Sequence, residues 1–205
     1  MLNEFFDKVY LINLPQSTDR LERAIINCEK VGVEFELVPA IDGISKEVII
    51  NGKEHDGWNR NAAALSLTTL NIIKNAKEKG YKNIFIMEDD IDFIQNRFNL
   101  ILTRALSGLP EDWDFFHLNV TNETEPLWVS NCLIKLGGAW CCQAYGINSS
   151  MYDIYISELD KHMMPIDEIT RDLHKSRGNS YATLPSIVVH HEGNYSTLRE
   201  KNVEY

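Results

Sequence analysis

The sequence lacks the features that mark membrane, secreted and nucleic-acid-binding proteins. Its 205 residues contain no apolar run long enough to span a bilayer, and residues 1–8 lack the basic-then-apolar order of a signal peptide. No block of Lys and Arg is longer than two residues, and the net charge of 20 − 30 = −10 disfavours a grip on nucleic acid phosphates. We therefore expect a cytoplasmic protein with no membrane span and no nucleic acid partner.

Motifs of several common site types are also missing. The four cysteines include no Cys-x-x-Cys pair, and Cys141 and Cys142 are adjacent, which favours reduced thiols over a zinc site or a disulfide framework. Neither Gly-x-Gly-x-x-Gly nor Gly-x-x-x-x-Gly-Lys-Ser/Thr occurs, so neither a dinucleotide-binding site nor a P-loop is indicated.

The apolar segments predict an α/β fold in one domain, the size expected for 205 residues. Strands and helices alternate up to about residue 110, as in a Rossmann-like sheet, whereas strands follow strands from residue 111, which implies some antiparallel pairing. We expect strands at 9–14, 35–38, 84–87, 114–120, 128–136, 139–147 and 186–189, and helices at 19–31, 61–80, 93–106, 148–162 and directly after Pro165. A polar loop of about fifteen residues after Gly43 is long enough to bind a ligand.

The most informative stretch is Ile84 to Asp92, where four apolar residues run into four carboxylates. An apolar run without polar alternation is typical of a strand buried on both faces. The acids Glu88, Asp89, Asp90 and Asp92 then lie at its carboxyl end, which is the ligand-binding edge of open α/β sheets. If the extended conformation persists, Glu88, Asp90 and Asp92 share one side and Asp89 points the other way. Crowded carboxylates repel one another unless a cation holds them together, so we expect Mg²⁺ or Mn²⁺ with a bound phosphate. A solvated acidic turn is the simpler alternative.

Two adjacent histidines, His190 and His191, follow the last predicted strand. Neutral imidazole binds Mn²⁺ well beside carboxylates, and neighbouring residues on a strand point in opposite directions. One of the two is therefore expected to complete a metal site with the carboxylates at the end of the strand that begins at Ile84. We predict His190, because it directly continues the strand; a surface or core histidine is the alternative role.

The order of several segments resembles that of glycosyltransferase family 25, which includes lipooligosaccharide and collagen galactosyltransferases. The similarity spans roughly residues 8–198 and rests on Leu11-Ile12-Asn13-Leu14 with Asp19-Arg20, Ala64-Leu65-Ser66, Glu88-Asp89-Asp90, the strand of Tyr145, and Pro165-Ile166-Asp167. The resemblance implies a GT-A fold, a UDP-sugar donor, a glycan or glycoprotein acceptor, and usually Mn²⁺. It also implies one domain over residues 1–205, with a nucleotide-binding half at 1–110 and an acceptor half at 111–205.

The resemblance further implies roles for individual residues. Asp90 would bind the metal, and Glu88 would lie near the metal or the ribose. The residues expected to bind the donor are Asn13, Arg20, Ser66, Glu88 and Asp89. Leu67 replaces the histidine of the family's Ser-His pair, a departure that bears on donor choice and on activity.

Galactosyltransferases of this family invert configuration, which requires a general base on the acceptor hydroxyl. The hydroxyl attacks from the face opposite the departing UDP, so this base must be separate from the metal-bound acids. We assign it to Asp167, in the first turn after Pro165, with Glu168 as the alternative. A non-catalytic sugar-nucleotide- or carbohydrate-binding protein and a metal-dependent phosphohydrolase remain as competing functions.

Overall fold

The computed structural model describes residues 1–43, 49–50, 53–54, 57–161, 165–191, 195–196 and 201–202, so most of the loop expected after Gly43 lies outside the described residues. The strands are β1 (Lys8–Asn13), β2 (Glu36–Pro39), β3 (Ile49–Ile50), β4 (Lys53–Glu54), β5 (Asn83–Glu88), β6 (Ile91–Phe93), β7 (Phe115–His117), β8 (Thr121–Asn122), β9 (Leu127–Ser130), β10 (Leu133–Lys135), β11 (Ala139–Trp140), β12 (Ala144–Asn148), β13 (Ser180–Thr183), β14 (Val188–His190), β15 (Tyr195–Ser196) and β16 (Lys201–Asn202). The helices are α1 (Leu2–Phe5), α2 (Thr18–Val31), α3 (Gly57–Glu78), α4 (Phe98–Ser107), α5 (Tyr152–Lys161) and α6 (Ile166–Arg177), with a 3₁₀ turn at Ser149–Met151 before α5. None of the described helices combines the length and apolar character needed to cross a bilayer.

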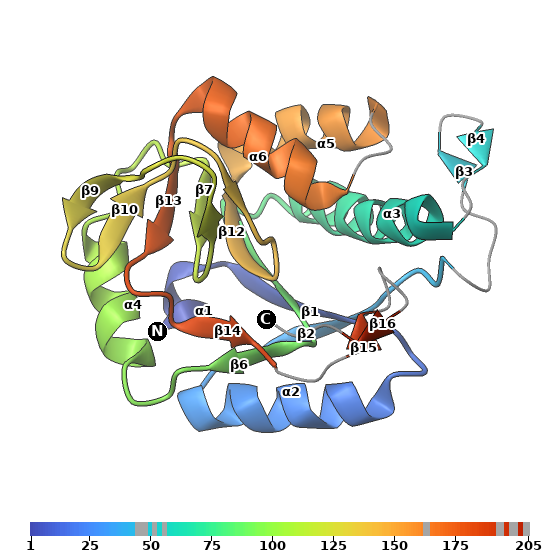
Figure 1. Cartoon of the computed structure of the whole chain (residues 1–205), viewed down its shortest axis with the longest axis horizontal. Coiled ribbons are helices and arrows are strands. Elements are labelled where there is room, and N and C mark those ends of the chain that lie inside the picture. The colour runs from blue at the N-terminus through green and yellow to red at the C-terminus, as the bar shows by residue number, and fades with distance from the viewer. Residues whose placement is uncertain are drawn as a thin grey trace.

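Eight strands form the central sheet in the order β2-β1-β5-β12-β7-β13-β10-β9 (Figure 1). β2, β1 and β5 run parallel, whereas β12 runs antiparallel to both β5 and β7. The carboxyl ends of β1, β2 and β5 therefore meet at one edge, and the first residues of β12 lie beside the end of β5. The mixed sheet agrees with the predicted change from alternating elements to consecutive strands.

Helices cover both faces of this sheet (Figure 1), because the sheet strands are apolar on both sides. On β5, Phe85 and Met87 belong to the core cluster shared with α2 and α4. Ile84 and Ile86 point the other way, into the cluster shared with α3, α5 and α6. The unbroken apolar run before the acids thus has the burial that was predicted for it.

Four elements differ from the sequence prediction. The single strand expected at 128–136 is a hairpin of β9 and β10, and the one expected at 139–147 is divided into β11 and β12. The helix expected from residue 93 begins at Phe98, because Phe93 belongs to β6, which pairs with β14. β13 was not predicted, although it lies inside the sheet between β7 and β10.

A buried pair of histidines predicts how stability depends on pH. The Nε2 atoms of His117 and His174 are 3.1 Å apart, and both side chains are buried. Burial lowers the pKa of His117 to about 4, and burial with the neighbouring imidazole also lowers the pKa of His174. Since histidines of the unfolded chain titrate near 6.5, the unfolded chain binds protons that the folded protein excludes. We expect the free energy of unfolding to fall as the pH drops from about 6.5 to about 4.

Urea unfolding at a series of pH values measures this decline, and imidazole NMR resonances identify its source. The resonances of His117 and His174 should keep their neutral positions down to pH values well below 6.5. Protonation of either imidazole near pH 6.5 in the folded protein would contradict the prediction.

Candidate active site at the carboxyl ends of the parallel strands

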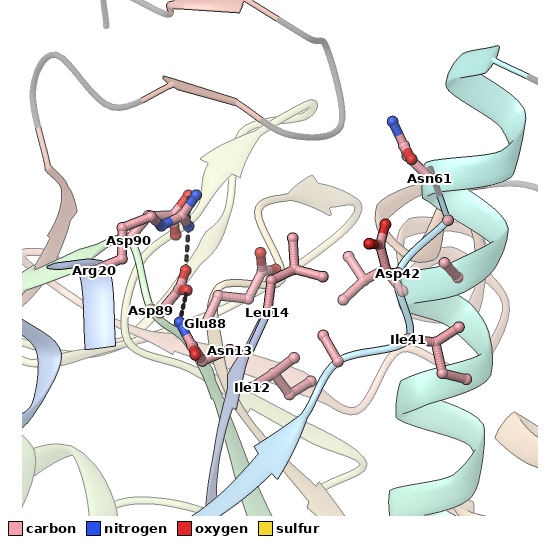
Figure 2. A pocket seen from close by; sticks show the side chains of 14 residues that line it. Ile12, Asn13, Leu14, Arg20, Ile41, Asp42, Asn61, Glu88, Asp89 and Asp90 are labelled. Atoms are coloured by element: carbon pink, nitrogen blue, oxygen red, sulfur yellow. Dashed lines mark hydrogen bonds and ion pairs between the residues drawn. The ribbon is translucent and has the colours of Figure 1, made fainter. Parts of the chain in front are cut away.

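A cavity opens where β1, β2 and β5 end (Figure 2). Asn13, Arg20 and the acids Glu88, Asp89 and Asp90 line one side of it. The opposite side is formed by the segment after β2 and the first turns of α3. Its lining residues are Ala40, Ile41, Asp42, Gly43, Asn61, Ala64 and Leu65. The cavity therefore joins a strongly acidic wall to a wall of mixed apolar and polar character.

Asp89 organises the two residues expected to hold the nucleotide. Its carboxylate accepts a hydrogen bond of 2.6 Å from Asn13 Nδ2 and forms an ion pair with the Arg20 guanidinium. Arg20 Nη2 also lies 3.4 Å from Asp90 Oδ2. Because Asp89 is buried, it acts as a rigid support that aims Asn13 and Arg20 at the cavity.

Glu88 and Asp90 lie close enough for their ionised carboxylates to repel each other. Burial raises the pKa of Glu88 well above its usual range, and the nearby Asp90 and Asp167 raise it further. Asp90 Oδ1 is buried and has no hydrogen-bond partner among the described residues. A buried carboxylate oxygen without a partner is costly, and a bound cation would remove that cost.

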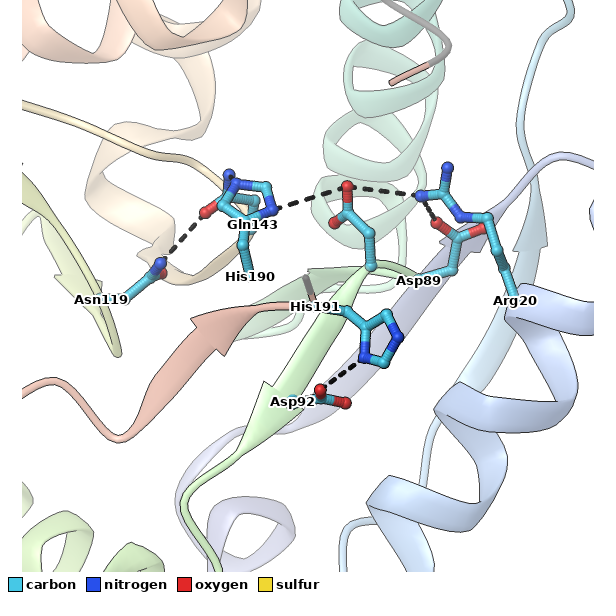
Figure 3. A network of polar contacts seen from close by, with 8 residues as sticks. Arg20, Asp89, Asp92, Asn119, Gln143, His190 and His191 are labelled. Carbon is cyan, nitrogen blue, oxygen red and sulfur yellow. Dashed lines mark hydrogen bonds and ion pairs between the residues drawn. The ribbon is translucent and has the colours of Figure 1, made fainter. Parts of the chain in front are cut away.

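His190 joins this acidic wall through a chain of polar contacts (Figure 3). His190 Nδ1 is 3.8 Å from Asp90 Oδ2, and its Nε2 contacts the amide nitrogen of Gln143. Asn119 Nδ2 in turn donates to Gln143 Oε1 over 3.1 Å. If Nδ1 faced a cation, Nε2 would carry the proton, and rotation of the Gln143 amide would present Oε1 as its acceptor.

His191 points away from this wall. Its Nδ1 is 2.6 Å from Asp92 Oδ2, and Asn27 of α2 also binds Asp92. The turn at Asp89 and Asp90 ends the extended conformation, so Asp92 does not continue the side on which Glu88 lies. The structure thus places His190, and not His191, beside the carboxylates.

The two acids proposed as general base begin α6. Asp167 Oδ1 accepts a hydrogen bond of 2.8 Å from the Cys142 backbone N–H, and Asp167 contributes to the raised pKa of Glu88. Glu168 instead lies near Arg171, one turn further along the helix. Asp167 is therefore the residue that adjoins the acidic wall.

Ser66 occupies a different position from the other predicted donor ligands. It is buried on α3, and the residues that line the cavity include its neighbours Ala64 and Leu65 but not Ser66. Leu67, in the place of the family's histidine, packs against the apolar core.

The acidic wall fits a divalent cation that arrives with a phosphate-bearing ligand. Among the residues that the structure describes, no three His, Cys, Asp or Glu side chains converge as a complete metal site. Mg²⁺ is typically held by one or two carboxylates, with substrate phosphates and water completing its shell, and Mn²⁺ favours the same ligands. Asp90, with its unpartnered oxygen, and Glu88 supply that number.

Gln143, Asn119, Asp42 and Asn61 were not predicted as site residues. Gln143 lies beside Glu88 because β12 pairs with β5, and its backbone oxygen accepts the Glu88 N–H over 2.8 Å. This pairing joins segments far apart in the chain, and no local pattern around Gln143 indicates it. Asp42 and Asn61 flank the polar loop after Gly43, which was the available signal.

Comparisons with known proteins agree on one family. Residues 6–170 match the family model described as glycosyltransferase family 25 (LPS biosynthesis protein). A Drosophila melanogaster protein named glycosyltransferase 25 family member is 27% identical over 184 residues, which cover 79% of this chain. The match covers 30% of that relative, so this chain corresponds to less than a third of its length.

A solved structure supports the fold. The crystal structure of a glycosyltransferase involved in the glycosylation of the major capsid of PBCV-1 gives a TM-score of 0.53 at 12% identity, covering 94% of this chain and 96% of that one. At this identity the likeness concerns the fold alone. The predicted α/β class is confirmed, and the mixed central sheet is consistent with a GT-A fold.

Proposed function

The chain belongs to glycosyltransferase family 25, and we propose that it transfers a hexose, galactose or glucose, from a UDP-sugar to a hydroxyl group of a glycan or glycoprotein. The observation that carries this proposal is the buried, unpartnered oxygen of Asp90 beside Glu88 in the cavity at the strand ends. Such a site suits the metal-bound diphosphate of a nucleotide sugar better than a neutral ligand.

The two walls of the cavity suit the two ends of a nucleotide. Ile41, Ala64 and Leu65 provide apolar contact for a planar base, and Asp42 and Asn61 provide polar groups near its edge (Figure 2). Across the cavity, Arg20 supplies a positively charged guanidinium group, and its ion pair with Asp89 fixes the position of this group. We assign the base and ribose to the first wall and the diphosphate to the second.

Asp90 and Glu88 would hold the cation, with His190 as a further ligand next to Asp90. A bound Mn²⁺ or Mg²⁺ would neutralise the negative charge that develops on the departing UDP. Arg20 would add positive charge on the same side, since it already lies 3.4 Å from Asp90.

Asp167 would take the proton of the acceptor hydroxyl. It stands on α6 beside the acidic wall, and the Cys142 N–H fixes the direction of its carboxylate. A base held in one orientation loses little freedom when the acceptor binds, which favours proton transfer.

The first test is a thermal-shift matrix of UDP, UDP-galactose and UDP-glucose, each with and without Mn²⁺. Because the residues that the structure describes offer an incomplete set of metal ligands, we expect Mn²⁺ alone to raise the melting temperature only slightly. Mn²⁺ with UDP should raise it by more than the sum of the separate shifts, since a ligand at 100 times its dissociation constant stabilises by about 2.7 kcal/mol.

GDP-mannose serves as the mismatched nucleotide in this matrix, and release of UDP from each donor measures turnover. A large rise in melting temperature with Mn²⁺ alone would contradict a site in which Mn²⁺ and UDP bind together. UDP binding that EDTA leaves unchanged would contradict it as well. Joint binding of Mn²⁺ and UDP without any turnover would instead favour a non-catalytic sugar-nucleotide-binding protein. Leu67, in place of the family's histidine, leaves that function open.

A further inference from the structure

The chain makes an unusual corner directly before β12. β11 ends at Trp140, and Cys141 has a φ of 86°, in the left-handed region that non-glycine residues rarely adopt. The next residue, Cys142, donates its N–H to Asp167. Backbone strain of this kind is concentrated at functional sites. Here it aims the Cys142 N–H at Asp167.

Trp140 is held against α6 by a cation–π contact with Arg171. The Arg171 guanidinium lies 4.4 Å from the centre of the indole ring. Arg171 is itself fixed by Asp172 at 2.7 Å and by Glu123 at 3.9 Å. These contacts hold the partly exposed indole in one orientation, which lowers the entropy lost when a ligand packs on it.

The indole is close to the carboxylate that we assign as general base. Arg171 follows Asp167 by four residues, so both side chains lie on one side of α6, about 6 Å apart along the helix axis. From the other direction, Trp140 and Cys142 are two residues apart, which limits their Cα separation to about 7 Å. A ring packed beside Trp140 can therefore extend a hydroxyl toward Asp167.

We propose that Trp140, oriented by Arg171, is the platform on which the acceptor binds, and that the acceptor is a pyranoside; this rests on the proposed function. One face of a pyranose ring carries several C–H groups of slight positive charge, and the face of an aromatic ring is negative. Because Arg171 lies over one face of the indole, the pyranose would stack on the opposite face, which leaves the sugar's hydroxyl groups free at the edge. One of these edge hydroxyls would then face Asp167.

The test compares Trp140→Leu and Trp140→Phe with Trp128→Leu. Trp128 is the matched control because it is 69% exposed on β9, five strands from β5 in the sheet. The probes are methyl β-D-galactopyranoside, methyl β-D-glucopyranoside and an unglycosylated peptide with serine and threonine hydroxyls. Acceptor KM, donor KM and release of UDP without acceptor are measured on each variant, and glycoside binding is followed by saturation-transfer NMR.

We expect Trp140→Leu to raise the acceptor KM for a glycoside by about 10-fold and Trp140→Phe to raise it by about 3-fold, because phenylalanine keeps an aromatic face. The donor KM should stay unchanged in both, and Trp128→Leu should match the wild type throughout. A merely structural role of Trp140 would lower donor turnover and the melting temperature together, without a separate effect on the acceptor.

Unchanged acceptor KM in Trp140→Leu, or a wild type that glycosylates the peptide and binds no glycoside, would overturn the inference and leave the proposed function standing. If the wild type released no UDP from any donor, the proposed function would fail. Glycoside binding by the wild type and its loss in Trp140→Leu would still decide the role of Trp140 in that case.

Discussion

Asp90→Asn should abolish Mn²⁺-dependent UDP binding while leaving the fold intact. Asparagine keeps the volume of aspartate and one of its oxygens, but it removes the charge that would neutralise a cation. Loss of a partner outside the metal shell already lowers metal affinity 10- to 100-fold, so loss of a charged ligand should lower UDP affinity in Mn²⁺ by at least about 100-fold. Titration calorimetry with UDP, in Mn²⁺ and in EDTA, measures this difference.

The fold of the variant should be intact for a specific electrostatic reason. Asp90 is one of the charges that raise the pKa of Glu88, so its neutralisation relieves repulsion within the acidic wall. Arg20 keeps its ion pair with Asp89. Without metal, the melting temperature of Asp90→Asn should therefore equal or exceed that of the wild type.

Asp92→Asn is the matched control, since the same substitution is made two residues further along. Asp92 pairs with His191 and Asn27, on the side away from Glu88, so UDP affinity should not change. Persistent Mn²⁺-dependent affinity in a folded Asp90→Asn protein would remove this carboxylate from the site, and an equal loss in both variants would indicate a general effect of charge.

The location of the acidic wall could be predicted because it depends on one local pattern. A strand such as β5, buried on both faces, must be apolar throughout, and the first charged residue after it marks the sheet edge. Glu88, Asp89 and Asp90 stand at that edge in the structure. The local pattern did not predict the turn at Asp89 and Asp90, which ends the extended conformation and separates Asp92 from the other acids.

β13 shows where local patterns are insufficient. Its sequence, Ser180 to Thr183, is half polar, yet all four residues are buried because β7 and β10 enclose it. The buried hydroxyl of Thr183 donates a hydrogen bond of 2.9 Å to the Leu118 carbonyl. Such burial follows from pairing with segments about 50 to 70 residues away, which neither propensity nor periodicity records.

Gln143 and His190 illustrate the same limit within the site. We predicted that a histidine would approach the acids because His190 directly follows the last predicted strand. His190 Nδ1 does lie 3.8 Å from Asp90 Oδ2. Its partner Gln143 arrives from β12, through an antiparallel pairing with β5 that the sequence does not specify. A residue that orients a site residue is thus harder to predict than the site residue itself, because the two lie far apart in the sequence and share no local sequence pattern.

The largest loss of turnover with donor binding retained is expected from Asp167→Asn. The variant keeps an oxygen that can accept the Cys142 N–H, so the corner before β12 should be preserved. What it loses is the basic carboxylate, and loss of a general base lowers turnover by roughly 10²- to 10⁴-fold. Transfer and UDP affinity, measured on the same preparation, separate this effect from misfolding.

Glu168→Gln is the neighbouring control that tests the choice between the two acids. Because Glu168 lies toward Arg171, and not toward the Cys142 N–H and Glu88, its variant should keep most of the transfer activity. A profound loss in Glu168→Gln with normal transfer by Asp167→Asn would reverse the assignment. Near-normal transfer by both variants would mean either that the base lies elsewhere or that this chain does not use the inverting mechanism. In that mechanism, a carboxylate separate from the metal-bound acids must take the proton of the acceptor hydroxyl.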